Sequence, residues 1–260
     1  MSAFLRNVGK VSNAEPVSLK TRFGRRRVGG KLFRNLGPLR GVTASTGGDP
    51  YFANVVSLLH FDGADASTTF TDAFRTWTAV GNSQIDTAQS VFGGASGLFD
   101  GLADSLTTAS ETGFNFGSGD FTVEWRHRFA NLPSAINWHQ ILVDEPRSNQ
   151  LAVGDGDNLY LTTSGGAKTS DVLTISTNTW YAFAMSRVGN TLYFFQDGVG
   201  IGTADVTALT VDLSGTGTRL GGMDTGVNVV DGWLDELRVT KGVGRYNANY
   251  TIATAAFPDS

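Results

Sequence analysis

Alternation of apolar and polar residues with a period of two dominates the sequence after residue 50. The clearest case is 121–129 (FTVEWRHRF), where the odd-numbered residues from Phe121 to Phe129 share one face. The even-numbered residues of this stretch are polar and share the other face, which is the pattern of a β-strand with one side buried. Further strands are predicted at 55–61, 141–143, 158–163, 180–187, 191–196 and 232–240.

Turn residues separate these predicted strands. Val188-Gly189-Asn190 and Asp197-Gly198 supply the backbone freedom that tight hairpins need. The segments 180–187, 191–196 and 199–202 are therefore expected to form a meander of antiparallel strands. No helical pattern exceeds about two turns. We predict an all-β sandwich of about a dozen antiparallel strands over 51–260.

Composition excludes several classes of protein. The 260 residues, 40% hydrophobic and 17% charged, can bury a substantial core. The sequence has no cysteine, which excludes a disulfide scaffold, a thiolate zinc site and a cysteine nucleophile. No apolar run approaches the roughly 20 residues of a membrane-spanning helix. Residues 1–10 lack the apolar segment of a secretory signal, so no membrane partner is predicted.

Charge is distributed unevenly along the chain. Residues 1–40 hold ten Lys and Arg and one acidic residue, Glu15, which gives +9 and leaves −13 for the rest of a chain whose net charge is −4. Glycines at 24, 29, 30 and 37 would interrupt a long helix. We therefore predict an extended, basic N-terminal arm over 1–50, with the boundary at Gly47-Gly48-Asp49-Pro50, followed by the domain 51–260.

Basic side chains in this arm are mixed with isolated large apolar ones, a pattern that favours docking on a partner. The predicted docking residues are Arg22, Phe23, Arg25, Arg26, Arg27, Lys31, Phe33 and Arg34. A disordered basic tail and nucleic-acid binding are the alternatives. Nucleic acid is disfavoured because the rest of the chain is acidic and shows no nucleic-acid motif.

Five stretches, spread in order over the predicted sandwich, carry a family resemblance. They are 57–63 (SLLHFDG), 92–96 (FGGAS), 116–125 (FGSGDFTVEW), 180–198 and 232–241 (GWLDELRVTK). Together they resemble the concanavalin A-like jelly roll of the laminin-G type. The last stretch, with Gly244-Arg245-Tyr246 and 256–259 (AFPD), is similar to the version found in structural proteins of tailed-bacteriophage virions. The resemblance implies a concanavalin A-like jelly-roll fold, which by itself does not fix a function.

The acidic residues offer no local pair for glycoside hydrolysis. Glycanases of this fold place two carboxylates on one strand face, about 5 Å apart for retention of configuration. Glu124 has no acidic neighbour on its own face, and alternation places Asp235 and Glu236 on opposite faces. Asp235 is predicted to share an apolar face with Trp233, Leu237 and Val239, and to accept backbone N–H bonds from a nearby turn.

The three histidines also give no catalytic pattern. His60, His127 and His139 are scattered, and none has a companion at metal-ligand spacing. His127 lies on the apolar face of its strand and is interpreted as a hydrogen-bonded core residue. No G-x-S-x-G nucleophile motif accompanies them. The protein is therefore predicted not to be an enzyme.

Two kinds of binding site remain candidates. Laminin-G-type domains can hold calcium with loop oxygens, which the resemblance would place at Asp155, Asp157 and Asn158; the alternative is a tight hairpin. No other cofactor is predicted. A sugar site needs an aromatic ring as a stacking platform, and Trp77 and Trp138 are the candidates least committed to a strand face. Partly buried packing is the alternative for both tryptophans.

Two classes of function follow from these observations. The favoured hypothesis is a non-enzymatic structural protein of a bacteriophage virion, either a capsid decoration or cement protein or a tail-associated protein. Its arm would dock on other virion proteins, and it would be a homo-oligomer such as a trimer, assembled in the bacterial host cytoplasm. The alternative is a glycan-binding adhesin or receptor-binding module that captures a cell-surface glycan.

Overall fold

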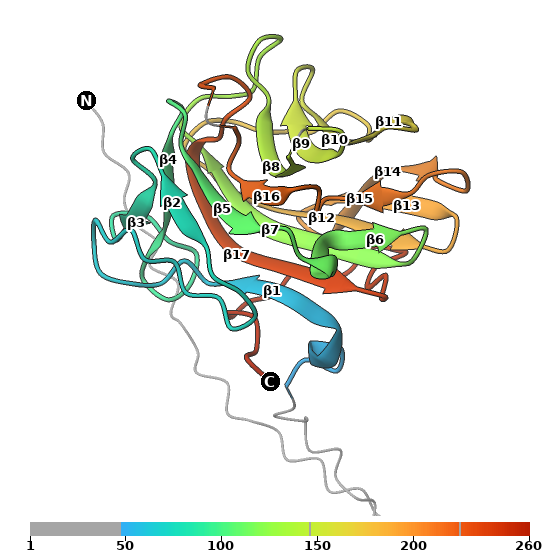
Figure 1. Cartoon of the computed structure of the whole chain (residues 1–260), viewed down its shortest axis with the longest axis horizontal. Helices are drawn as coiled ribbons and strands as arrows, with labels where there is room; N and C mark the ends of the chain where they lie inside the picture. The colour runs from blue at the N-terminus through green and yellow to red at the C-terminus, as the bar shows by residue number, and fades with distance from the viewer. Residues whose placement is uncertain (1–47, 146, 224) are drawn as a thin grey trace, which may run out of the picture. The chain divides into compact units, whose positions relative to one another are not determined.

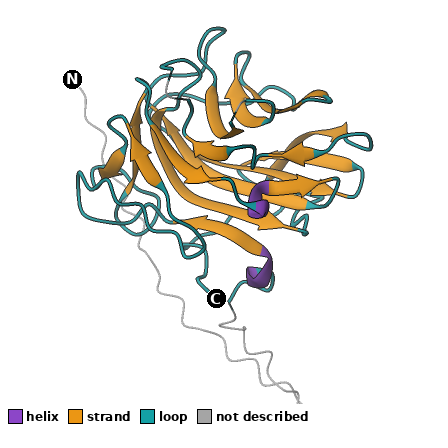
Figure 2. Cartoon of the chain, in the orientation of Figure 1, coloured by secondary structure: helices purple, strands orange, loops and turns teal. Residues whose placement is uncertain are grey.

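Two antiparallel sheets pack face to face in the part of the chain that the structure describes (Figure 1). This structure is a computed structural model, and it describes residues 48–145, 147–223 and 225–260. Apart from the strands, these residues form two short 3₁₀ helices, η1 (Phe52–Asn54) and η2 (Thr112–Phe114), as Figure 2 shows. The predicted all-β jelly-roll sandwich is confirmed, with seventeen strands among the described residues instead of about a dozen.

The larger sheet has eight strands. Their order is β14 (Val199–Asp205), β13 (Thr191–Gln196), β12 (Trp180–Val188), β7 (Phe121–Phe129), β17 (Asp231–Lys241), β4 (Ser96–Asp100) and β3 (Gln84–Asp86), and β1 (Val55–Leu59) also pairs with β17. The predicted meander is confirmed, because β12, β13 and β14 are consecutive antiparallel neighbours.

The second sheet has seven strands. Their order is β11 (Gly166–Thr169), β10 (Asn158–Thr163), β9 (Gln150–Gly154), β8 (His139–Asp144), β16 (Gly217–Leu220), β5 (Ser105–Ala109) and β2 (Thr78–Val80). A small two-stranded sheet joins β6 (Asn115–Gly117) to β15 (Val211–Asp212).

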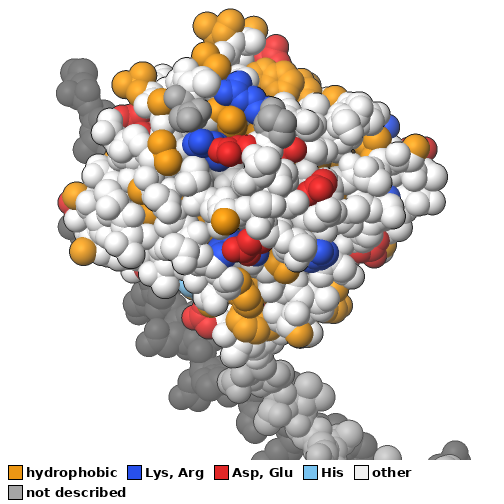
Figure 3. Space-filling view, viewed as in Figure 1, with side chains coloured by type: hydrophobic (Ala, Val, Ile, Leu, Met, Phe, Trp, Pro, Cys, Tyr) orange, Lys and Arg blue, Asp and Glu red, His pale blue; other side chains and the backbone are white. Residues whose placement is uncertain are grey.

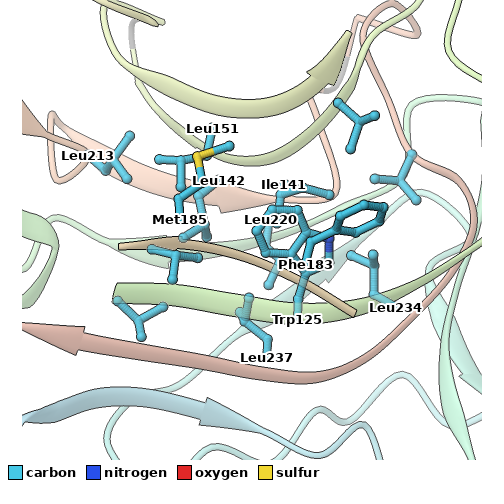
Figure 4. Close-up of a cluster of buried hydrophobic side chains, with 14 of the residues drawn as sticks. Trp125, Ile141, Leu142, Leu151, Phe183, Met185, Leu213, Leu220, Leu234 and Leu237 are labelled. Atoms are coloured by element: carbon cyan, nitrogen blue, oxygen red, sulfur yellow. The ribbon is translucent and has the colours of Figure 1, made fainter. Parts of the chain in front are cut away.

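The core fills the space between the two large sheets. Figure 4 shows Ile141, Leu142 and Leu151 of the seven-stranded sheet facing Trp125 and Phe183 of the larger one. The apolar face read from 121–129 is confirmed, because its odd-numbered residues are all buried. The opposite face is not solvent-exposed as expected, because Thr122, Glu124 and Arg126 are buried as well. Burial of large apolar side chains from both sheets is the main force holding the layers together.

Two buried histidines meet across the sheets. Nε2 of His127, on β7, lies 3.3 Å from Nδ1 of His139, on β8, and the two share a hydrogen bond. His127 is thus a hydrogen-bonded core residue, as predicted, but its pairing with His139 could not be read from the sequence. Burial lowers the pKa of both rings, to about 3 for His139.

The prediction that Asp235 shares one face of its strand with Trp233, Leu237 and Val239 is wrong, because β17 contains a bulge. The pairing of β17 with β7 shifts between Asp235 and Arg238, and Glu236 has a φ of 50°. Leu237 lies in the core as expected, whereas Trp233 pairs opposite Arg128 on the outer face, and its indole N–H donates to Asp86. The extra residue resets the alternation in mid-strand, so the two halves of β17 have opposite phase.

The other half of the Asp235 prediction is confirmed. Its Oδ2 accepts the backbone N–H groups of Val91 at 2.7 Å and Phe92 at 3.3 Å. These residues belong to the turn before β4, so the buried carboxylate fastens this turn to β17.

Candidate functional site

A hollow lies on the outer face of the seven-stranded sheet. It has a volume of about 620 Å³. Three elements, β2, β5 and β16, form its floor, and the segments before β2 and after β5 and β8 form its walls. The lining residues are Arg75, Thr76, Thr78, Thr107, Thr108, Ala109, Glu111, Glu145, Thr216, Gly217 and Arg219.

Strand alternation puts the polar side chains of this hollow outside. On β5, Leu106 is buried in the core while Thr107 lies on the opposite face. On β16, Leu220 is buried and Arg219 lies beside Thr107. The same period of two that builds the core therefore presents threonine hydroxyls and one guanidinium to solvent.

Arg219 is held in place at the floor of the hollow. Its Nε donates to Oε1 of Glu145, and its Nη1 donates to Oγ of Ser105 at 3.2 Å. The side chain of Arg219 is 13% exposed and that of Glu145 is 34% exposed. A guanidinium fixed on two sides in this way keeps its planar group oriented for a ligand.

A second arginine closes the wall of the hollow. Nη1 of Arg75 lies 3.3 Å from Oε2 of Glu111, and its guanidinium stands 4.0 Å above the ring of Phe114. Burial lowers the pKa of Arg75, while the charges of Glu111 and Asp72 oppose this shift. Both carboxylates that line the hollow, Glu111 and Glu145, are thus paired with arginines.

Trp77 lies next to this hollow but faces away from it. It is 4% exposed, its indole N–H donates to Oδ2 of Asp72, and its ring packs against Phe114. Its neighbours Thr76 and Thr78 line the hollow, so the tryptophan between them points into the core. Its ring is packed in the core, which is the alternative that the sequence left open, and is not available for stacking.

Trp138 lies elsewhere on the same sheet, against Tyr160. Their ring centroids are 4.4 Å apart, and both side chains are half-buried. A Cβ at Gly154 would collide with Tyr160 and approach Trp138 closely, so the two rings cover bare backbone there. Figure 3 shows hydrophobic side chains gathered over the loops beside β8 and β9, and Ile136 in the loop before β8 is 83% exposed.

The three residues of the predicted calcium site lie in the hairpin between β9 and β10. Asp155 accepts the Tyr160 hydroxyl with its backbone oxygen, and Asn158 donates from its side chain to Ser170. Asp157 has a φ of 53°, which a tight turn requires. In 48–145, 147–223 and 225–260, no group of three or more His, Cys, Asp or Glu could hold a metal ion. The structure thus accounts for these residues as a hairpin, and calcium stays a prediction.

Glu124 belongs to an ionic cluster on the outer face of the larger sheet. It lies 2.8 Å from Nη2 of Arg238 and accepts the Tyr246 hydroxyl at 2.8 Å. Asp49 accepts hydrogen bonds from both Arg238 and Arg245. Burial acts to raise the pKa of Asp49, but the hydrogen bond from Arg245 and the two arginine charges hold it below its usual value.

The predicted arm can be followed only at its end. Its eight docking residues, from Arg22 to Arg34, lie outside the described residues. Asp49 falls within the predicted arm, yet it is buried in the ionic cluster, and its backbone N–H donates to the oxygen of Ser260 at 2.8 Å. A separated sandwich should therefore keep residues 48–50. Within the described residues, no helix is long and apolar enough to cross a membrane.

The hollow itself was not identified from the sequence. Arg75, Glu145 and Arg219 come from three distant segments, and each is unremarkable in its local pattern. The only local signal was the polar side of 105–109 and 217–220, which fits any strand with one solvent-facing side.

Comparison with known proteins gives a family and a fold. A family model described as the concanavalin A-like lectin/glucanases superfamily (Laminin_G_3) matches residues 99–243. A search of curated proteins finds no match.

Several solved structures share the fold at low sequence identity. Domain 4 of AbnA, an extracellular GH43 arabinanase from Geobacillus stearothermophilus solved in complex with arabinotriose, has a TM-score of 0.57 at 16% identity, over 74% of this chain and 94% of that one. The ligand-binding domain of botulinum neurotoxin serotype D, in complex with N-acetylneuraminic acid, has a TM-score of 0.55 at 14% identity, over 75% and 49%. A Trypanosoma rangeli sialidase in complex with sialic acid has 0.50 at 13%, over 78% and 32%. The chain thus spans about half of the neurotoxin domain and about a third of the sialidase.

Proposed function

Because the chain belongs to the concanavalin A-like lectin/glucanases superfamily, we propose that its sandwich is a glycan-binding module. The binding site is the hollow over β2, β5 and β16. Its volume of about 620 Å³ falls in the range of small-molecule sites, about 300–1,000 Å³, and suits a short oligosaccharide.

The fixed Arg219 guanidinium is the observation that carries this proposal. Glu145 and Ser105 hold it in one orientation, and Thr107 and Thr78 stand beside it on neighbouring strands. Sugars present many hydroxyl groups, which need donors and acceptors at fixed positions. A rigid floor of this kind can bond such a ligand with little loss of side-chain entropy.

The structural neighbours support a sugar as the ligand. Two of them are complexes with arabinotriose and N-acetylneuraminic acid, which are ligands of those proteins. Their fold is shared with this chain although the sequences have diverged, so the class of ligand is part of the proposal and the individual sugar is left to experiment.

The proposal includes binding without cleavage. Hydrolysis of a glycosidic bond needs one carboxylic acid that can give up a proton and a second carboxylate beside the sugar. The two carboxylates that line the hollow are each paired with an arginine, Glu145 with Arg219 and Glu111 with Arg75, and we assign them the role of holding these arginines in place. Incubation with bound glycans should therefore release no reducing ends, and detectable release would refute this part.

The binding test is a glycan array followed by titration calorimetry with the best ligand. We expect Arg219→Gln to weaken binding about tenfold or more, because a hydrogen bond to a charged group contributes about 1.5–3 kcal/mol. Thr107→Val, which removes one hydroxyl at nearly constant volume, should weaken binding by a smaller factor.

Arg128→Gln is the matched control, because Arg128 lies on the outer face of the other sheet, where it bonds Asn178. Its affinity should equal that of the unchanged protein. Failure to bind any glycan, or equal weakening by the control, would reject the hollow as the site.

A second candidate function rests on the charge of the arm. Residues 1–40 carry +9 and the rest of the chain −13, a separation that suits attachment of the arm to an acidic surface. We propose, as an addition compatible with glycan binding, that the arm fastens the protein to a larger assembly. The resemblance to tailed-bacteriophage proteins suggests a capsid or tail lattice, with the protein in the virion as a homo-oligomer such as a trimer. Comparison of the full chain with residues 48–260 tests this attachment.

A further inference from the structure

A second pocket lies on the opposite side of the sandwich, on the outer face of β13 and β14. It has a volume of about 280 Å³. The residues that matter for the argument are Tyr193, Phe195, Gly200, Gly202, Asn247 and Asn249. This pocket shares no residue with the hollow over β5 and β16.

An irregular pairing of two strands opens the pocket. The register between β13 and β14 shifts between Tyr193 and Phe195, and Gly202 in this stretch has a φ of 125°. A Cβ at Gly200 would lie 3.8 Å from the ring of Phe195, so the missing side chain leaves space above this ring, whereas a Cβ at Gly202 would point toward Ser170 and Asp171. A ligand can therefore approach a ring that a side chain would otherwise cover.

Two aromatic rings form the floor. The rings of Tyr193 and Phe195 are nearly parallel, at 18°, with centroids 6.5 Å apart. Phe195 is fixed by edge contacts with Tyr246 and Tyr250, whereas Tyr193 is only half-buried. Tyr193 is thus an aromatic face on a rigid strand, which is what stacking against a sugar ring requires.

Polar groups that can form further hydrogen bonds lie at the rim of the pocket. Oδ1 of Asn249 accepts the backbone N–H of Gly200 at 2.8 Å, which fixes the amide and turns its NH₂ group to other partners. Among the described residues, neither the Asn247 side chain nor the Tyr193 hydroxyl makes a hydrogen bond. The rim thus offers several donors and acceptors to a ligand.

The charge of the pocket indicates the class of ligand. None of the described residues that line it is charged, whereas two arginines and two glutamates line the hollow on the other sheet. A carboxylated sugar would lose water here without gaining a cation. A neutral ring loses only hydroxyl hydration, which the amides can replace.

We propose that this pocket binds a neutral pyranose, with its ring stacked on Tyr193 and its hydroxyls bonded by Asn247 and Asn249. The module then carries two sugar sites on opposite faces and can bridge two glycans or bind a branched one with higher avidity. This inference goes beyond the proposed function, because it involves different residues and specifies a neutral ligand.

The test follows backbone amide signals by NMR in the full chain. Methyl glycosides of glucose, galactose, mannose and N-acetylglucosamine are added to about 50 mM, well above a millimolar Kd typical of weak single-site binding. At least one should shift the signals of Gly200, Gly202 and 247–249, whereas N-acetylneuraminic acid should leave them unchanged.

Matched variants assign the effect to the ring. Tyr193→Ala should weaken binding at this pocket about tenfold, and Tyr193→Phe, which keeps the ring, should weaken it less than about threefold. Arg219→Gln should leave these shifts unchanged. Loss of glycan binding at the hollow over β2, β5 and β16 can therefore be distinguished from loss of binding at this pocket. No shift with any neutral glycoside, or equal binding by Tyr193→Ala, would overturn the proposal.

Discussion

The carboxyl group of Asp235 is fully buried and bonded on one oxygen only. Its Oδ2 accepts two backbone N–H groups, while Oδ1 has no partner among the described residues. Burial raises its pKa to about 7, against the lowering effect of these hydrogen bonds. Since this pKa lies above that of the unfolded chain, the folded protein binds an extra proton, and its stability rises as pH falls from about 7 toward 4.

Substitution of Asp235 should separate its charge from its hydrogen bonds. Asp235→Asn keeps an oxygen acceptor and removes the titration, so the free energy of unfolding at pH 8 should equal or exceed that of the unchanged protein. Asp235→Ala leaves two N–H groups unpaired and should lose about 1–3 kcal/mol. Urea unfolding between pH 5 and 8 measures both. Parallel pH profiles for the unchanged protein and Asp235→Asn would contradict the raised pKa.

At the scale of single residues, the sequence predicted which side chains are buried better than it predicted which side chains contact one another. The apolar face of 121–129 and the turn-binding role of Asp235 were both predicted and are confirmed. The meeting of His127 with His139 was not, because it depends on how β7 lies over β8 in the other sheet. Local alternation contains no information about what lies across a core.

At the scale of elements, the bulge in β17 also fastens the C-terminal segment. Oε1 of Glu236 bonds Nδ1 of His60 at 2.8 Å, and its Oε2 accepts the N–H of Phe257 at 2.8 Å. His60 also bonds Asp259 at 3.0 Å. The backbone turn at Glu236 therefore joins the end of β1, β17 and the last residues of the chain.

The contacts at this junction predict a raised pKa for His60. The hydrogen bond to Glu236 is the largest cause that raises the pKa of His60, to about 9, with a smaller contribution from Asp259. The stabilisation is fully present below the unfolded pKa of about 6.5 and is lost as pH rises through about 9. NMR titration should show this pKa directly. Glu236→Gln should lower it below about 8, and Asp259→Asn should lower it less.

Either of two results would contradict this account of the junction. One is a His60 pKa near 6.5 in the unchanged protein; the other is a larger effect of Asp259→Asn than of Glu236→Gln. The bulge that creates the junction could not be predicted, because a non-glycine residue at positive φ leaves no mark on the polar pattern of 232–240.

At the scale of the whole molecule, the separation of charge predicts different behaviour of the full chain and of residues 48–260. The full chain should bind an anionic surface more tightly than residues 48–260. Suitable surfaces are heparin resin and virion particles assembled without this protein. Salt should weaken this binding, because the Debye length falls from about 10 Å at 0.1 M to about 3 Å at 1 M. Cosedimentation at low and high salt measures the difference.

The truncation should begin at residue 48 so that Asp49 stays with Arg238 and Arg245. Removing one member of such a buried ionic cluster costs about 3–5 kcal/mol, and the resulting instability would be mistaken for loss of the arm. Equal binding by both forms at low salt would reject the arm as the anchor and move the contact to the sandwich.

The sequence by itself determined the all-β class, most of the strands, the turns of the meander and the separation of charge. Each of these depends on residues that are neighbours along the chain, where a period of two or a glycine in a turn acts locally. The tertiary structure alone decided the two pockets. Arg219 meets Glu145 and Ser105, and Tyr193 and Asn249 line one pocket, only because segments distant in sequence become neighbours in space. Long-range strand pairing selects these neighbours, and a one-residue bulge such as that at Glu236 is enough to change which side chains face solvent.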